Sequence, residues 1–134
     1  MRGPKGDTGA AGGTVLFWSG ILDAATAYFV QLFRDTSAPS NTRTVINEIE
    51  LTSARTLSRL RVSTEANVTK NVTFTIYQNG SATALTCTIA SGTASASDLT
   101  HSVAFAQGDT VALQATNTAG SPGGTFVAAT LESV

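Results

Sequence analysis

The sequence predicts an all-β protein built as an antiparallel β-sandwich. Apolar and polar residues alternate over much of the chain after Thr14, which is the period of strands that bury one face. Clusters of Gly, Pro, Asn and Ser separate these runs about every ten residues, a spacing typical of all-β sandwiches. Thr, Ser, Asn and Gln make the surface polar, since charged residues are only 13 % of the 134 residues, and Thr favours strands.

The first strands are expected to be strongly apolar. One covers residues 14–19, and the next covers residues 27–33, which are apolar on both faces. A helix over residues 22–33 is the alternative, because their apolar side chains have helical spacing, but the β-branched and aromatic end favours a strand. Residues 43–51 then alternate loosely after a loop that Pro39 interrupts.

The following strand, residues 54–64, carries an irregular pattern. Leu60 and Val62 share one face of an extended chain, whereas Leu57 falls on the other. The pattern therefore predicts a β-bulge or a change of register between Leu57 and Leu60.

Residues 71–80, "NVTFTIYQNG", are the clearest strand. Val72, Phe74 and Ile76 point one way, and the intervening Thr and Tyr residues point the other. Asn79-Gly80 is the strongest two-residue hairpin signal in the chain. The return strand, "ATALTCTIA", is expected to turn three apolar side chains inward, those of Leu85, Cys87 and Ile89.

A second hairpin is expected over residues 100–117, after a loop at residues 91–98. Its turn is Gln107-Gly108-Asp109, and apolar residues alternate on both sides of it. These are Val103 and Phe105 before the turn, and Val111, Leu113 and Ala115 after it. Residues 118–124, "TAGSPGG", form a flexible loop before a final strand that runs to the C-terminus.

The N-terminus has a different period. Glycine stands at four positions three residues apart, Gly3, Gly6, Gly9 and Gly12, as a collagen triple helix requires, because only Gly fits at its axis. We therefore predict two parts, a collagen-like stalk at residues 1–13 and a β-sandwich head at residues 14–134. Four triplets cannot hold three chains together, so the head is expected to be a homotrimer.

A collagen repeat followed by "AQGDTVALQATN" and "GGTFVAATL" resembles the jelly-roll heads of the tumour-necrosis-factor and complement-component type. In the resemblance Gly108-Asp109 is a turn and Thr125-Phe126 opens a final strand on the three-fold axis. It implies a jelly roll whose trimer interface contains Phe126, Phe105 and Leu131. The stretch from "NVTFTIYQNG" onward is still closer to sandwich domains of phage tail fibres and bacterial adhesive fibres. That resemblance implies an extracellular fibre tip, on a virion or a bacterial surface.

Composition argues against several other classes of protein. The formal net charge is -1, and no basic stripe suited to nucleic acid is visible. Arg55, Arg59 and Arg61 cluster, but among Thr, Ser and Leu they are interpreted as a solvated strand face. No apolar window is long enough for a transmembrane helix. We therefore expect no nucleic-acid partner and no membrane insertion.

No catalytic or cofactor site is expected. Cys87 is the only cysteine and His101 the only histidine, and Cys87 lies in an apolar strand, where it is interpreted as a buried hydrophobe. Glu48 and Glu50 share a strand face and are interpreted as solvated. No cluster has metal-ligand spacing, and "GSPGGT" lacks the Lys and helix of a phosphate loop. The sequence thus predicts a protein that is not an enzyme and holds no metal.

Polar loops on a rigid scaffold favour a binding function. The expected function is the receptor-binding tip of a trimeric fibre that recognises a cell-surface glycan or envelope component. The candidate ligand residues are Tyr77, Asn79 and Trp18, because sugar sites combine an aromatic ring with amides. The alternative is a purely structural head that trimerises and caps the collagen-like fibre. Three Asn-x-Ser/Thr triplets, at Asn67, Asn71 and Asn79, would be glycan acceptors only in a secreted animal protein.

Overall fold

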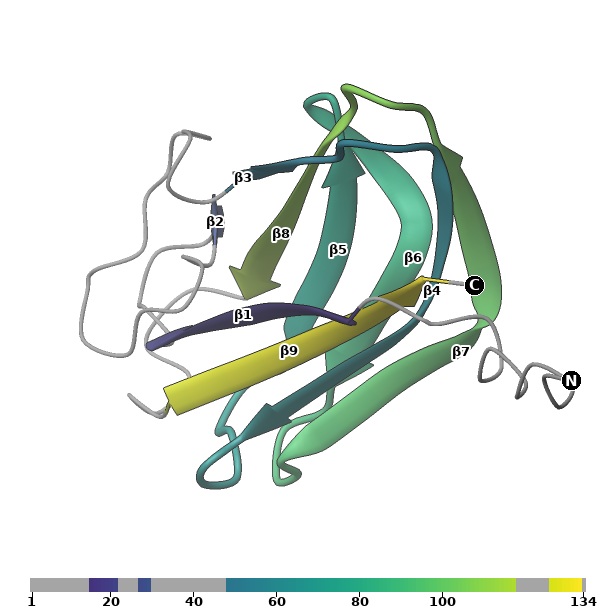
Figure 1. Ribbon diagram of the computed structural model, residues 1–134. Coiled ribbons are helices and arrows are strands. Elements are labelled where there is room, and N and C mark those ends of the chain that lie inside the picture. Colours follow the sequence, from purple (N-terminus) through teal and green to yellow (C-terminus); the bar gives the residue numbers. More distant parts are fainter. Residues whose placement is uncertain (1–14, 22–26, 30–47, 118–125, 134) are drawn as a thin grey trace, which may run out of the picture.

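Two antiparallel β-sheets pack face to face in the computed structural model (Figure 1). It describes residues 15–21, 27–29, 48–117 and 126–133, with side chains only in the last two ranges. The nine strands in these residues are β1 (Val15–Ile21), β2 (Ala27–Phe29), β3 (Glu48–Glu50), β4 (Arg55–Thr64), β5 (Val72–Gln78), β6 (Ser81–Ile89), β7 (Ser95–Phe105), β8 (Thr110–Asn117) and β9 (Phe126–Ser133).

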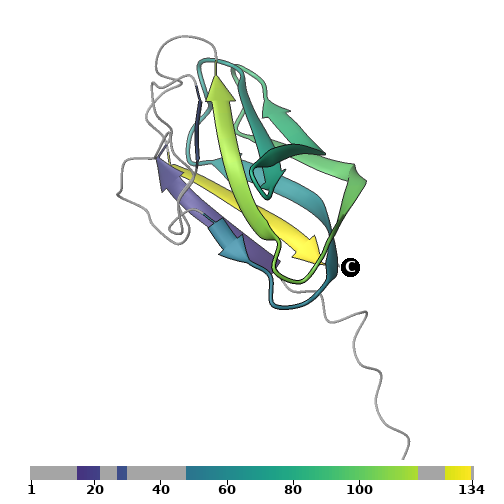
Figure 2. The same cartoon turned by 90° about the horizontal axis from the view of Figure 1, so that it is seen from above.

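The strands are shared between two sheets, here called sheet A and sheet B. Sheet A has the order β1-β9-β4-β7, and sheet B has the order β2-β8-β5-β6, with β3 also paired to β8. Every described pair is antiparallel. Figure 2 shows β1 and β9 side by side in one layer, with β8 in the other. This architecture confirms the predicted all-β antiparallel sandwich and is compatible with a jelly roll.

The core lies between the sheets and is made of alternate residues from both. In β5 the pattern is as predicted, since Val72, Phe74 and Ile76 are fully buried and the residues between them are not. Each such side chain contributes about 1.5–3 kcal/mol by leaving water. Its neighbours in sheet B, β6 and β8, supply Leu85, Cys87, Ile89, Val111, Leu113 and Ala115, and the facing sheet A supplies Leu57, Leu60, Val62, Phe105, Val127, Ala129 and Leu131.

The predicted bulge in β4 is confirmed. Ser58 pairs with Glu132 of β9, but the next pair is Arg61 with Thr130, so β4 holds one residue more than β9 at this point. Arg59 takes up the extra residue in the left-handed region, with φ of 56°. As a result Leu57, Leu60 and Val62 are all buried.

The Asn79-Gly80 hairpin is also confirmed. Both residues have positive φ, 50° and 87°, as a type I′ turn requires. Gln78 pairs with Ser81 on either side of the turn. The two residues therefore join β5 and β6 as the sequence predicts.

The second predicted hairpin is wrong. The turn exists, with Gly108 at φ of 89° and the Asp109 amide donating to the Ala106 carbonyl over 3.1 Å. However, β7 pairs with β4 in sheet A, whereas β8 pairs with β5 in sheet B. The turn carries the chain from one sheet to the other, a path that local alternation does not distinguish from a hairpin. The predicted loop at 91–98 is also too long, because β7 begins at Ser95.

The two ends of the sandwich differ in what they hold. At one end, the near end, β1 begins opposite Glu132 and β9 finishes, and the 79–80 and 106–109 turns lie there as well. At the opposite end, the far end, the loops at 65–71 and 90–94 lie side by side, at the bottom of the view in Figure 1. The first described strand, β1, therefore starts at the near end.

Several expectations fall outside the described residues. These are the collagen-like stalk at 1–13, the loop at Pro39, most of the alternative helix at 22–33, and the loop at 118–124. Within the second strand that was predicted, residues 27–29 form β2. In the described part of the chain, no helix has the length and apolar character needed to span a membrane.

Candidate functional site

An open groove lies on the outer face of sheet A, with a volume of about 560 Å³. This volume is within the range of about 300–1,000 Å³ that is usual for ligand sites. The groove crosses the three strands β4, β7 and β9. It is lined by Arg61, Val62, Ser63, Ser95, Ala96, Ser97, Ala128 and Thr130.

Strand register builds this groove from two rows of outward-facing residues. In the first row, Arg61 of β4 lies between Ser97 of β7 and Thr130 of β9. In the second row, nearer the far end, Ser63 lies between Ser95 and Ala128. Small side chains at the flanking positions leave room above the sheet, so the groove follows from residue size as well as from register.

The polar groups of the groove are not used by the fold. Among the described residues, Arg61 has no carboxylate partner, and the hydroxyls of the lining Ser and Thr residues make no side-chain hydrogen bond. Glu132, the nearest carboxylate along β9, instead lies 3.8 Å from Nε of Arg59. The β4 bulge makes that pairing possible because it turns Arg59 outward beside Glu132. The groove therefore presents a cation and several hydroxyls to solvent.

An exposed aromatic ring lies next to the groove, on the side toward the far end of the sandwich. Phe126, the first residue of β9, is 46 % exposed. The side chains of β9 alternate between exposed and buried, so Phe126 points to the same side as Ala128 and Thr130. The predicted interface residues Phe105 and Leu131, by contrast, are buried inside the chain's own core. A trimer contact of these two residues, and of the exposed Phe126, stays a prediction.

The outer face of sheet B is polar in a different way. Its hydroxyls bond to one another across the strands, Thr73 to Thr88 over 2.8 Å and Thr75 to Thr86 over 3.1 Å. Tyr77, a predicted ligand residue, lies on this face. Its hydroxyl donates to Oε1 of Gln114 over 2.9 Å, so the polar tip of the ring is already bonded within the sheet.

Asn79, the second predicted ligand residue, lies at the near end in a network of its own. Its Nδ2 donates to Oδ1 of Asp109 over 2.8 Å, and its Oδ1 accepts from the Thr110 amide over 2.9 Å. Hydrogen bonds from Asn79, the Ala106 amide and Gln78 hold the pKa of Asp109 below its ordinary value. The network ties the β5–β6 turn to the β7–β8 turn.

Trp18, the third predicted ligand residue, belongs to β1. It pairs in register with Ala129 of β9. Its side chain lies outside the described side chains, so its ligand role stays a prediction. Of the three candidates, Tyr77 and Asn79 are on sheet B or at the near end, and neither lines the groove on sheet A.

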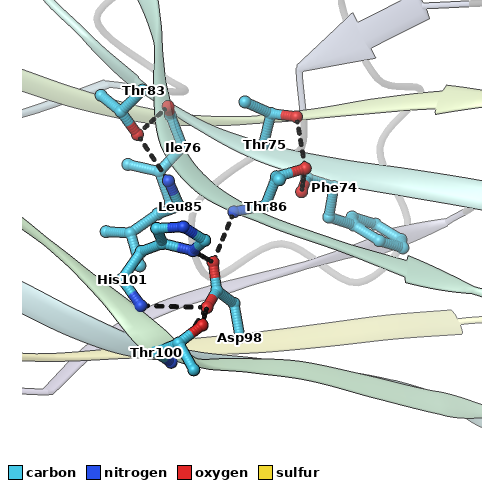
Figure 3. A network of polar contacts seen from close by, with 9 residues as sticks. All are labelled: Phe74, Thr75, Ile76, Thr83, Leu85, Thr86, Asp98, Thr100 and His101. Carbon is cyan, nitrogen blue, oxygen red and sulfur yellow. Dashed lines mark hydrogen bonds and ion pairs between the residues drawn. The ribbon is translucent and has the colours of Figure 1, made fainter.

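Asp98 of β7 is a buried carboxylate that sequence reasoning missed (Figure 3). It is 6 % exposed and lies where β7 itself bulges, since Leu60 pairs with Asp98 but Ser58 pairs with Ser102. Its Oδ1 accepts from the amides of Thr100 and His101 over 3.1 and 3.2 Å. Those amides belong to the irregular part of β7, where Thr100 and His101 are not paired with residues of β4. Asp98 therefore accepts their hydrogen bonds in place of a backbone carbonyl of the neighbouring strand.

The other oxygen of Asp98 joins the two sheets. Oδ2 accepts from the Thr86 amide on β6 over 3.2 Å and lies 2.8 Å from Nδ1 of His101. Burial alone raises the pKa of this carboxyl, but the hydrogen bonds from His101, Thr86 and Thr100 outweigh burial and hold the pKa well below its ordinary value. The sequence feature that could have indicated this buried carboxylate is an Asp followed three residues later by His in a strand rich in Ser and Thr.

The surroundings of Cys87 and His101, two of the residues considered for catalysis, do not favour a reactive thiol. Burial, with a smaller contribution from Asp98, raises the pKa of the Cys87 thiol to about 12, whereas a nucleophilic cysteine needs a lowered pKa. His101 is engaged by Asp98. Glu48 is half-buried and Glu50 exposed on β3. In the described residues, no three His, Cys, Asp or Glu side chains are grouped to hold a metal ion.

The two far-end loops are fastened together. The amide of Val68 donates to Thr93 and the amide of Gly92 donates back to Val68, over 2.8 and 2.7 Å, while the Val68 side chain is buried. Oδ1 of Asn71 accepts from the Ser91 amide over 2.9 Å. The Glu65 amide donates to the Phe126 carbonyl over 3.0 Å, which joins this pair of loops to the far end of β9.

Arg61 is exposed, as the sequence predicts, but its neighbours along the chain do not predict that it lines a groove. Two short patterns in the sequence could have indicated the groove, Arg-Val-Ser at residues 61–63 and Ser-Ala-Ser at residues 95–97. Their alignment, however, depends on a strand pairing between residues more than thirty positions apart. Only the register of β4 with β7 and β9 brings these side chains into one groove.

The sequence matches no protein-family model and no curated protein. Among solved structures, one similar chain is a family 35 carbohydrate-binding module from Clostridium thermocellum, with 15 % sequence identity and a TM-score of 0.44. The similarity covers 90 % of this chain and 98 % of that chain. A likeness of this size carries no functional argument, which has to come from the residues themselves.

Proposed function

We propose that this protein is the non-catalytic, receptor-binding head of a trimeric fibre, and that it recognises a glycan on a cell envelope. The observation that carries the proposal is the groove on sheet A, whose hydroxyls and guanidinium are not engaged by the described residues. Saccharides are recognised by such hydrogen-bonding groups together with an aromatic face. The exposed ring of Phe126 on the same face offers that platform.

The position at which β1 begins supports a binding surface that lies away from the proposed stalk. β1 begins at the near end, so a stalk that precedes it approaches from there. The far-end loops and the Ser63–Ser95 row of the groove lie away from the stalk. In a trimer, three identical sites would convert weak single-site binding into useful avidity, by about a hundredfold or more. The trimer itself is inferred from the period-three glycines at residues 3–12.

A purely structural cap is the second candidate. Phe126 favours it, because an exposed phenylalanine beside the small Ala128 also suits a contact with another protomer. In that case the outer face of β9 would lie against neighbouring chains, as the resemblance to jelly-roll heads implies.

Light scattering combined with a glycan array separates these candidates. The full chain is expected to have three times the mass of one chain in dilute buffer and to bind a subset of bacterial envelope glycans. Binding should weaken only modestly between low and high salt, since the described residues of the groove carry a single unpaired charge. A folded trimer that binds no glycan would favour the cap, and a stable monomer would contradict the fibre.

A further inference from the structure

We infer that the groove on sheet A takes a carboxylate-bearing saccharide, with the carboxylate on Arg61 and a sugar ring against Phe126. This inference rests on the proposed glycan-binding function and names the class of glycan. It draws on three observations that concern different residues. These are the charge state of the groove, its hydroxyls, and the distance to the aromatic ring.

The charge in the groove is positive and unpaired within the described residues. Arg61 is exposed, and its guanidinium has no ion-pair partner. Arg59 does not compete for a ligand in the same way, because Glu132 already lies beside it. A guanidinium offers two parallel N–H donors that fit a carboxylate, a pairing stronger than bonds to neutral acceptors. The groove thus favours a ligand with a carboxylate over its neutral counterpart.

The surroundings of Arg61 favour a sugar over a bare anion. Ser97 and Thr130 flank it within its own row, and Ser63 and Ser95 follow in the next. Hydroxyls both donate and accept, so they complement the hydroxyls of a sugar, whereas a small anion needs only donors. An anion site would also be expected to gather more than one cation, and the described lining holds one.

The length of the site indicates more than one sugar residue. Phe126 and Thr130 are four positions apart on β9, which corresponds to about 14 Å at about 3.4 Å per residue. Arg61 is paired with Thr130 at one limit, and Phe126 stands at the other. A single pyranose ring is shorter than this span. An oligosaccharide that stacks one ring on Phe126 can place the carboxylate of another residue at Arg61.

The test uses the full chain and matched pairs of oligosaccharides. Each pair consists of a hexuronate- or sialate-containing oligosaccharide and the same molecule after chemical reduction of its carboxyl group to an alcohol. Calorimetry on the pairs that an array selects is expected to show binding at least about tenfold tighter for the carboxylated member. Arg61→Gln should remove this preference by weakening the carboxylated member more than the reduced one, while Arg59→Gln, the control, should preserve it.

Phe126→Ala should weaken both members of each pair equally, because stacking does not depend on the carboxylate. Light scattering of this variant should still give the oligomer of the parent chain. Dissociation on this substitution would assign the face to a protomer contact and overturn the inference. Melting curves of Arg61→Gln and Phe126→Ala should match the parent chain, since both side chains are exposed.

Failures of the two proposals are distinguishable. Glycans that bind equally well before and after carboxyl reduction would overturn the carboxylate inference and leave glycan binding standing. A preference that persists in Arg61→Gln would likewise overturn the assignment to Arg61. A folded chain that binds no member of any pair, and no neutral glycan, would overturn the proposed function itself.

Discussion

The outer faces of the two sheets are both polar, but their polar groups differ in how they are used. On sheet B, Thr73 bonds to Thr88, Thr75 to Thr86, and Tyr77 to Gln114. On sheet A, the serines and threonine around Arg61 have no such partners among the described side chains. The first face satisfies its own hydrogen bonds and stabilises the sheet, and the second keeps its groups available.

This difference shows why composition alone is a poor guide to a binding face. Both faces are rich in hydroxyls, and by residue type sheet B has the better aromatic candidate in Tyr77. A hydroxyl that is already bonded gains little from a ligand, because the ligand has to replace an existing hydrogen bond of similar strength. The faces are distinguished by cross-strand pairing, which depends on the residue directly opposite.

The largest effect is expected for Asp98→Ala, which acts beneath both faces. The substitution leaves the amides of Thr86, Thr100 and His101 without their acceptor, and we expect a loss of about 3 kcal/mol in the free energy of unfolding. Chemical denaturation measures it. Asp98→Asn, the matched control, keeps one acceptor oxygen and should lose less. Equal stability of the alanine variant and the parent would show that the bulge holds without this carboxylate.

The same residue makes a prediction about pH. Because the folded pKa of Asp98 is lowered, its contribution to stability is fully present above the unfolded pKa of about 4 and is lost as pH falls toward the folded pKa. Acid unfolding of the parent should therefore be steeper below pH of about 4 than that of Asp98→Asn. The variant should keep part of the dependence, since the pKa of Asp109 is lowered as well. Identical acid unfolding profiles of the parent and the variant would show that Asp98 does not contribute to the pH dependence of stability.

A smaller effect is expected for Asn79→Ala. Residue 79 has a φ of 50°. Asn tolerates this left-handed conformation because its side chain forms local hydrogen bonds, whereas alanine forms none, which costs about 1 kcal/mol. The substitution also removes the bonds to Asp109 and Thr110, for a total of about 1–2 kcal/mol in thermal or denaturant unfolding. Glycan affinity should not change, because Asn79 lies away from the groove. A loss of affinity at unchanged stability would return the ligand site to the near end.

The smallest effects are expected for hydroxyl substitutions on the two outer faces. Thr75→Val on sheet B should cost about 0.5–1 kcal/mol in the free energy of unfolding and leave glycan affinity unchanged, since it removes a hydrogen bond internal to the sheet. Ser97→Ala on sheet A should change stability by less than about 0.5 kcal/mol and weaken glycan binding measurably. The reverse pattern, with binding lost in the valine variant, would exchange the roles of the two faces.

Much of the fold follows from local sequence. The alternation of β5, the Asn79-Gly80 turn and the bulge between Leu57 and Leu60 depend on residues close in the chain, and all three are confirmed. The sheet to which β8 belongs does not follow, because a turn such as 106–109 suits both a hairpin and a crossing between sheets. The start of β7 at Ser95 does not follow either, because the first residues of this strand are small and polar and suit a loop as well as a strand.

The candidate site was less predictable than the fold. Arg61 acquires its surroundings from β7 and β9, and its availability depends on Arg59 lying beside Glu132. Asp98 lies at the irregular part of β7 and accepts from the Thr86 amide of β6, a strand of the other sheet. Single-residue properties pointed to Tyr77 and Asn79, whose polar groups are bonded within the fold.

The antiparallel pairing of β1 with β9 has a mechanical consequence. A stalk would pull on β1 from Val15 at the near end, while a ligand in the groove would hold β4 and β9 farther along the same sheet. The tension then runs along the strands, so the hydrogen bonds from Val15 to Ile21 are loaded in shear and resist together. Pulled across the strands, the same bonds would open one after another at a much lower force. If the proposed fibre head binds its glycan in the groove, this geometry would help it to remain attached under flow.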